Sequence, residues 1–302
     1  MNPWTPLVVA TLGWGSAAVL TRALLNNGVS TFIVVPMRFS IALVLLVVIS
    51  PFWGRFLGMD RVHWARGLVL GTVALAIPNT LFTLGLEDLP VSLGGLLVAL
   101  IPIATVGGAH FLVDGERFNP GSIPGIVVSL VGTGILVGVG GFTIAGVGNL
   151  WRGVGLSLIA VAFAGVGGAL TRRYALEVGG GGLVIPQFAS AALICLIAPL
   201  LVDTTPLDTI ETSNWALLIA LGAVATALPF SSFLIAAEVN PTSRLAVVGY
   251  LVPVIAVILA VIFLNERLTA AVIVGAVLIL GGVFLTERSS RHVPVPGIDT
   301  AG

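Results

Sequence analysis

Two stretches of the sequence decide its fold. Leu-Ile-Pro-Ile-Ala-Thr occupies 100–105 and is followed by Asp-Gly-Glu-Arg at 114–117, while Leu-Val-Pro-Val-Ile-Ala occupies 251–256 and is followed by Asn-Glu-Arg at 265–267. Each is an apolar run that contains a proline and ends on a Glu-Arg pair. The two prolines are 151 positions apart and the two glutamates 150 apart. The same structural unit therefore occurs twice.

The same separation relates residues along most of the chain. At 151 positions, the matching pairs are Trp64 and Trp215, Gly71 and Gly222, Pro78 and Pro229, Phe82 and Phe233, Glu87 and Glu238, and Pro90 and Pro241. At 150 positions, 15–22 matches 165–172, sharing Leu-Thr-Arg, and Pro36 matches Pro186. Chance would not hold one separation over this length, so the chain is an internal duplication.

The composition places both copies in a membrane. Hydrophobic residues make up 57% of the 302 and charged residues only 9%, against about 25% charged in soluble domains. A helical crossing needs roughly 20 apolar residues. Transmembrane β-strands would be half as long and would alternate in polarity, so the pattern predicts ten helices. They cover 5–25, 32–50, 64–84, 90–112, 121–140, 151–171, 182–202, 214–236, 242–264 and 269–286.

The predicted fold is an all-α integral membrane protein with ten transmembrane helices in two inverted five-helix repeats. Five is an odd number, so the second copy enters the membrane from the opposite side. We place the first repeat at 1–147, the second at 148–288 and a short cytoplasmic tail at 289–302.

The arginines orient the chain, which has no lysine. Cytoplasmic loops of membrane proteins carry an excess of positive residues. If the N-terminus is inside, nine arginines are cytoplasmic, three are outside and Arg38 lies within the second span. We therefore expect both termini in the cytoplasm. The cytoplasmic arginines are Arg55, Arg61, Arg66, Arg117, Arg172, Arg173, Arg244, Arg288 and Arg291, and the outer ones are Arg22, Arg152 and Arg267.

Several functional classes are excluded or disfavoured. A net charge of zero argues against nucleic-acid binding, and the single Cys195 excludes a disulfide framework. The chain has no H-E-x-x-H or G-x-S-x-G motif, so an integral membrane enzyme is a remote alternative. We expect no catalytic residue, cofactor or metal. The expected partners are a small-molecule substrate and the lipid bilayer, with the chain as a monomer.

The doubled motif resembles the EamA type of the drug/metabolite transporter superfamily. The opening Gly13-Trp14-Gly15-Ser16 and the intramembrane Arg38 fit the same family. The resemblance covers nearly all of the chain. It implies ten helices, an inner-membrane location and export of small metabolites. Within the family, the chain looks most like the YddG-type exporters of aromatic amino acids.

An inverted repeat also predicts a mechanism. In secondary transporters two inverted halves surround one midplane site and exchange conformations, which opens the site to each side in turn. We expect a secondary transporter that exports small metabolites, aromatic or hydrophobic amino acids first. The alternatives are a carrier of nucleotide sugars or other metabolites, which would need several basic residues, and a carrier of hydrophobic cations, which would need an acid or several aromatics.

Polar residues inside the spans are candidates for substrate binding, because a polar group in hydrocarbon should face a cavity or a partner. Arg38 could anchor a substrate carboxylate, or could reach the outer interface or bond carbonyls freed by Pro36. Asn79, Phe82 and Thr83 share one helical face. They could form a polar and aromatic stripe for an amphiphilic metabolite, or Asn79 could bond a neighbouring helix.

The remaining site candidates are aromatic residues, prolines and one histidine. Trp14, Phe163 and Tyr250 could line the route or simply pack. His110 could carry a proton or bond another helix. All thirteen acids lie at span ends or beyond, so we expect flux to follow the substrate gradient, or any proton coupling to use His110 or groups of the substrate itself. The expected flexible points are Pro36, Pro78, Pro102, Pro186, Pro229 and Pro253.

Overall fold

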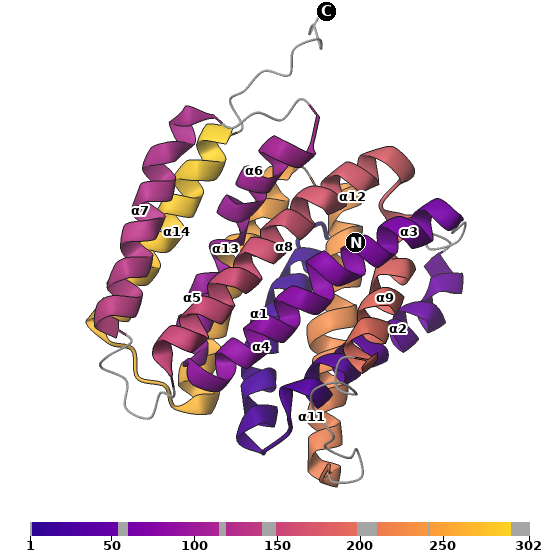
Figure 1. The fold of residues 1–302 in the computed structure, drawn as a ribbon, viewed down its shortest axis with the longest axis horizontal. Helices are drawn as coiled ribbons and strands as arrows, with labels where there is room; N and C mark the ends of the chain where they lie inside the picture. The colour runs from indigo at the N-terminus through magenta and orange to yellow at the C-terminus, as the bar shows by residue number, and fades with distance from the viewer. Residues whose placement is uncertain are drawn as a thin grey trace, which may run out of the picture.

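The computed structural model describes residues 2–53, 60–114, 119–140, 149–197, 210–240 and 242–290. Every regular element in these ranges is a helix (Figure 1). The first half contains α1 (Thr5–Asn26), α2 (Thr31–Trp53), α3 (Arg61–Leu70), η1 (Gly71–Ala76), α4 (Ile77–Asp88), α5 (Val91–Val98), α6 (Ile101–Leu112), η2 (Pro120–Ser122), α7 (Ile123–Ile135) and η3 (Leu136–Gly140). The second half contains α8 (Leu150–Val178), η5 (Gly181–Leu183), α9 (Val184–Ile197), α11 (Thr212–Gly222), η7 (Ala223–Ala227), α12 (Leu228–Val239), α13 (Thr242–Leu264) and α14 (Ala270–Ser290).

Nine helical segments in the described ranges are long and apolar enough to cross a membrane. The expected span at 182–202 corresponds to a shorter apolar helix, Gly181–Ile197, and its last five residues lie outside the described ranges. Ten crossings therefore stay a prediction. The nine segments are Thr5–Asn26, Thr31–Pro51, Arg61–Asp88, Val91–Leu112, Pro120–Gly138, Leu150–Val178, Thr212–Ala237, Val247–Leu264 and Ala270–Ser289.

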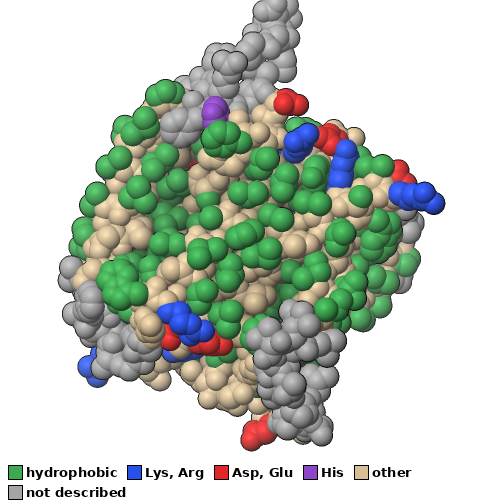
Figure 2. Space-filling model, in the orientation of Figure 1, with side chains coloured by type: hydrophobic (Ala, Val, Ile, Leu, Met, Phe, Trp, Pro, Cys, Tyr) green, Lys and Arg blue, Asp and Glu red, His purple; other side chains and the backbone are tan. Residues whose placement is uncertain are grey.

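The outer surface of the helices is apolar around the middle of the molecule. Val44, Leu130 and Val277 are each more than half exposed at mid-helix. Figure 2 shows hydrophobic side chains across the centre of one face, with charged side chains gathered near its two ends. Contiguous apolar patches of this extent mark a surface that contacts something other than water. This band fits the hydrocarbon of a bilayer, and the chain is a multi-pass membrane protein.

Prolines set the places where the helices change pitch. η1 and η7 are π-helical and end one residue before Ile77-Pro78 and Leu228-Pro229, respectively. Proline has no N–H, so the carbonyl four residues earlier loses its helical partner, and a π turn shifts the hydrogen bonding. The span expected at 90–112 is interrupted at Ala99 and Leu100, just before Pro102. Pro78 and Pro229 therefore mark a duplicated irregularity, whereas Pro253, the counterpart of Pro102, lies inside the continuous helix α13.

The helices pack as pairs that join the two halves of the chain. α1 packs on α12 and α13, α8 packs on α4 and α6, and α2 packs on α9. α7 and α14 lie side by side at one edge of the molecule (Figure 1). Their contact depends on glycine, because a Cβ on Gly125 would lie 2.5 Å from the carbonyl oxygen of Gly282 and from Oγ1 of Thr286. Small residues allow this backbone approach in membranes.

We predict that Gly125→Ala destabilises the protein, because the new methyl meets backbone atoms of α14 that cannot move independently. Overpacking of this kind costs about 1–3 kcal/mol. The measurement is the apparent Tm of detergent-solubilised protein. The matched control is Gly134→Ala on the same helix, where a Cβ meets nothing within 4 Å. Equal Tm values for the two variants would show that the α7–α14 contact is looser than described.

Candidate functional site

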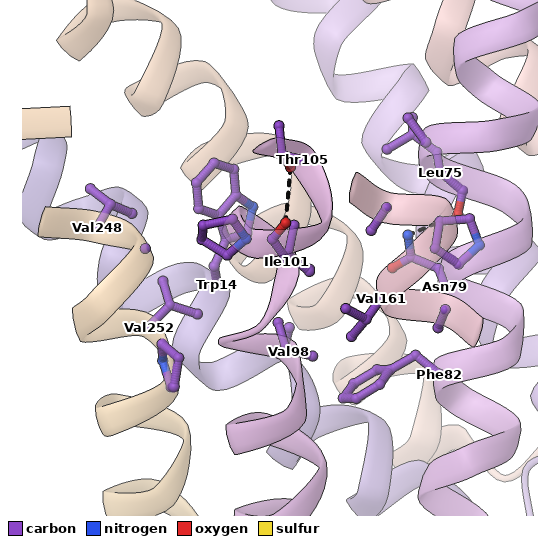
Figure 3. A pocket seen from close by; sticks show the side chains of 18 of the residues that line it. Trp14, Leu75, Asn79, Phe82, Val98, Ile101, Thr105, Val161, Val248 and Val252 are labelled. Atoms are coloured by element: carbon purple, nitrogen blue, oxygen red, sulfur yellow. Dashed lines mark hydrogen bonds between the residues drawn. The ribbon is translucent and has the colours of Figure 1, made fainter. Parts of the chain in front are cut away.

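A cavity of about 1100 Å³ lies among the helices of both halves of the chain. Most of its wall is aliphatic or aromatic (Figure 3). Ligand sites are commonly cavities of this size with a few polar groups in an apolar wall. The aromatic lining residues are Trp14, Phe39, Phe82, Phe188, Phe230 and Phe233. The polar ones are Arg38, Asn79, Thr105, His110, Arg172, Thr226 and Glu287.

Arg38 brings a positive charge to the wall of the cavity. Its Nε donates a hydrogen bond to Oγ1 of Thr226 at 2.7 Å. The same hydroxyl donates to the carbonyl of Leu221 at 2.7 Å, so its proton is used and its lone pair faces the guanidinium. Among the described residues, no carboxylate forms an ion pair with Arg38. The terminal Nη donors of Arg38 are therefore available to an anion.

Aromatic rings surround this charge. The guanidinium carbon of Arg38 lies 5.9 Å from the ring centroid of Phe39. The Phe39 ring is edge-to-face with Phe188 at 6.1 Å, and Phe188 is edge-to-face with Phe230 at 5.0 Å. Phe39 and Phe188 are almost fully buried. The ring faces favour a cation nearby, and their apolar bodies would contact the apolar part of a ligand bound at Arg38.

Asn79 presents a hydrogen-bond acceptor. Its Nδ2 donates to the carbonyl of Leu75 at 2.8 Å, which fixes the amide orientation because only the nitrogen can donate. Figure 3 shows the amide oxygen on the side of Asn79 that faces Val161, with the Phe82 ring below it. No described residue donates to this oxygen. The cavity therefore offers an acceptor on α4 as well as the donors of Arg38 on α2.

One end of the cavity reaches the surface. His110 lies near the end of α6, Arg172 on the last turns of α8 and Glu287 near the end of α14. The first two are exposed. The Glu287 carboxylate accepts a hydrogen bond from the Tyr250 hydroxyl at 2.7 Å. In the described ranges, no three His, Cys, Asp or Glu side chains group as a metal site. We call this the open end.

The opposite end is covered by an apolar cluster. Ala18, Val19, Leu86, Val91 and Ala260 are buried together there, with Phe82 packed against them. This cluster separates the cavity from the ends of α1, α4 and α13, and we call it the closed end.

Polar contacts between helices lie beyond that cluster. Glu266 accepts hydrogen bonds from the N–H groups of Val91 and Ser92 at 2.6 and 2.9 Å and so caps α5. Arg22 donates to the carbonyl of Leu86. The Glu87 carboxylate accepts from Thr31 at 2.7 Å. These contacts join segments far apart in the sequence, so the closed end is held by hydrogen bonds as well as by packing.

The structure brings four of the seven candidate substrate residues to the cavity: Trp14, Arg38, Asn79 and Phe82. The other three do not line it. Thr83 on α4 is only 2% exposed. Phe163 on α8 is partly buried outside the lining. Tyr250 is outside the lining, and its hydroxyl donates a hydrogen bond to Glu287, which is part of the lining.

Of the other candidates, four line the cavity: Pro78, Pro102, Pro253 and His110. Pro36, Pro186 and Pro229 are buried between helices instead. Pro186 packs on Gly67, and Pro229 packs on Gly13. The Glu116 end of the first repeat motif lies outside the described residues.

Sequence reasoning did not identify Phe39, Thr226, Phe188 or Glu287 as site residues. The sequence does contain a signal for Thr226. It is a polar residue within an apolar span, one turn before the duplicated Pro229, where the first repeat has Leu75. Phe39 directly follows Arg38 and also had a signal. Glu287 had none, because it stands at a span end where a charge is ordinary.

Known proteins share this architecture. The chain is 26% identical over 288 residues to the aromatic amino acid exporter YddG of Ancylobacter novellus, covering 94% of this chain and 96% of that protein. It is 21% identical over 243 residues to the uncharacterized transporter YxxF of Bacillus subtilis, covering 78% and 76% of the two proteins. A solved crystal structure with 22% identity has the same fold, with a TM-score of 0.67 over 96% of this chain and 98% of the other. The EamA-like transporter family matches residues 6–138 and 151–288, and the chain belongs to that family.

Proposed function

We propose that this chain exports small, largely apolar metabolites that carry a carboxylate, with aromatic and hydrophobic amino acids as the first class, across the bacterial inner membrane. The observation that carries the proposal is Arg38, which has no carboxylate partner among the described residues and lies in a cavity with aromatic walls. A guanidinium binds a carboxylate through two parallel hydrogen bonds. The similarity to the Ancylobacter protein, an aromatic amino acid exporter, supports the same class.

The rival substrates fit the cavity less well. Nucleotide-linked compounds carry phosphates, which call for several basic groups. Arg172, the only other arginine that the described residues bring to the lining, stands at the open end and already has a partner. Hydrophobic cations call for an acid, and the one acid in the described lining, Glu287, bonds Tyr250 at that same end. The cavity interior is therefore better suited to an organic anion group beside an apolar body.

We propose alternating access between two inverted five-helix repeats as the transport mechanism. The helix contacts support it, because equivalent glycines in the two halves each pack closely against a helix of the other half. A Cβ on Gly71 would clash with Gln187 and Ser190 of α9, and a Cβ on its counterpart Gly222 would clash with Ile41 of α2 and the Arg38 carbonyl. The two π segments before Pro78 and Pro229 form a second matched pair.

The open end is the proposed cytoplasmic end. Arg66, Arg172 and Arg173 lie at that end, as the positive-inside rule requires. The cavity in this conformation would then accept substrate from the cytoplasm, and closure there with opening at the other end would release it outside. This is the direction that export needs.

We predict that purified protein in liposomes takes up labelled phenylalanine saturably and that Arg38→Gln lowers this uptake at least about tenfold. A hydrogen bond to a charged group contributes about 1.5–3 kcal/mol, and 1.4 kcal/mol corresponds to tenfold in affinity. Arg38→Lys keeps the charge without the planar donor pair, so its uptake rate should lie between those of the wild-type and Arg38→Gln proteins. The readout is the initial uptake rate against substrate concentration.

The matched control is Arg61→Gln, an exposed arginine at the start of α3 outside the cavity. It should transport normally. Thermal unfolding of each variant separates a binding defect from misfolding. Normal uptake by a folded Arg38→Gln protein, or no saturable uptake of any apolar carboxylate, would contradict the proposal.

We predict that Glu266→Ala opens the closed end more often, because it removes both acceptors that cap α5. Each hydrogen bond contributes about 0.5–1.5 kcal/mol net, so loss of the pair should raise the labelling rate roughly tenfold. The measurement is labelling of Phe82→Cys, with Cys195 replaced by Ala, by a membrane-impermeant maleimide added outside. The control is Glu211→Ala, which removes an exposed acid near the same end. It should leave the labelling rate unchanged. Unchanged labelling in Glu266→Ala would show that these hydrogen bonds do not hold the end shut.

We predict that both termini are cytoplasmic. A fluorescent protein fused to either end should fold and fluoresce in cells, and alkaline phosphatase fused to either end should stay inactive, because the first needs the cytoplasm and the second needs the oxidising periplasm. Termini on opposite faces would exclude ten crossings and the inverted repeat with them.

A further inference from the structure

We infer that the preferred substrate is a net monoanion, an aryl carboxylate without a charged amino group, and that the membrane potential drives its export. This rests on the proposed function and narrows it: among apolar metabolites that carry a carboxylate, it ranks the deaminated aryl acids above the zwitterionic amino acids at the same site. The observation behind it is the charge balance of the cavity wall.

The ionisable side chains in the described lining are Arg38, Arg172, Glu287 and His110. With the histidine neutral, the wall carries one positive charge in excess. Arg172, Glu287 and His110 stand together at the open end and each has a partner. The excess charge in the interior therefore belongs to Arg38, whose only described polar partner is the neutral hydroxyl of Thr226.

Closing the open end would remove water from this charge. An isolated charge in a dehydrated interior is strongly unfavourable. A bound monocarboxylate neutralises Arg38 and makes the occluded state net neutral. A zwitterion brings its own ammonium into the same space and leaves the excess positive charge in place, so the occluded complex remains charged.

Away from the open end, where Glu287 bonds Tyr250, the described lining offers the ammonium group of an amino acid only neutral acceptors. Asn79 Oδ1 has no donor and could accept one hydrogen bond. The hydroxyl of Thr105 already donates to the Ile101 carbonyl at 3.0 Å. An ammonium has three N–H donors and loses full hydration on entry. A keto or methylene group at the same position loses far less, so the deaminated acid binds better.

The charge of the substrate fixes how transport responds to voltage. Arg38 belongs to the protein and does not leave it, so each cycle moves the net charge of the ligand alone. An inside-negative potential drives a monoanion outward. A zwitterion has no net charge, and its distribution does not respond to potential. This supplies a driving force without an acidic residue inside the membrane.

The test uses the full-length protein in liposomes, with phenylpyruvate and phenylalanine as matched probes. Valinomycin and an inward K⁺ gradient of about tenfold make the interior positive. At equilibrium a monovalent anion accumulates by the same ratio as the K⁺ gradient, about tenfold, because K⁺ and the anion carry unit charges in the same field. Protein-free vesicles and Arg38→Gln protein control for leakage, and Arg61→Gln is the charge-matched control.

We expect phenylpyruvate to accumulate against its gradient with wild-type and Arg61→Gln protein, and phenylalanine to equilibrate more slowly without accumulation. Phenylalanine uptake that depends on Arg38 and matches or exceeds phenylpyruvate uptake would overturn this inference and leave the proposed function standing. If folded protein transports neither probe, the proposed function itself fails.

Discussion

A guanidinium kept inside a membrane protein by a single hydroxyl is the constraint on which the site depends. Arg38 donates to Thr226 and has no carboxylate partner among the described residues. Such a charge is stable only while water or an anion reaches it. In the proposed mechanism, water reaches Arg38 in the open conformation, and a bound ligand replaces that water on closure. That mechanism would link substrate binding to conformational change through the solvation of one side chain.

The backbone follows the same rule, because hydrocarbon offers it no hydrogen-bond partners. Pro78 and Pro229 interrupt helical hydrogen bonding, and a π-helical segment precedes each of them. The Asn79 amide bonds the Leu75 carbonyl in that same region, and the Thr226 hydroxyl bonds the Leu221 carbonyl. Residues that satisfy the irregular backbone thus also line the cavity. The candidate site therefore lies where the helices are irregular.

Part of this site could be predicted from the sequence. Arg38, Asn79 and Trp14 interrupt apolar spans, and hydrocarbon penalises polar atoms wherever they face lipid. Thr83 could not be separated from Phe82, since neighbours on a helix differ by only about 100° in direction. Phe163 does not line the cavity, because the interior part of the wall on α8 is made by Ala160, Val161 and Ala164. Small residues leave space, and sequence periodicity does not show which face stays empty.

The two ends of the cavity differ in what must change for each to open or close. At the closed end, Glu266 and Glu87 accept hydrogen bonds from other helices, and water can replace those donors when the end opens. Each exchange costs about 0.5–1.5 kcal/mol, since the bonds to water recover most of what is lost. A few such exchanges amount to the 1–3 kcal/mol typical of coupling between sites. Neutralising Arg38 in a dry cavity involves a free energy of several kcal/mol, so in the proposed mechanism the bound ligand outweighs the hydrogen bonds at the closed end in setting the conformational equilibrium.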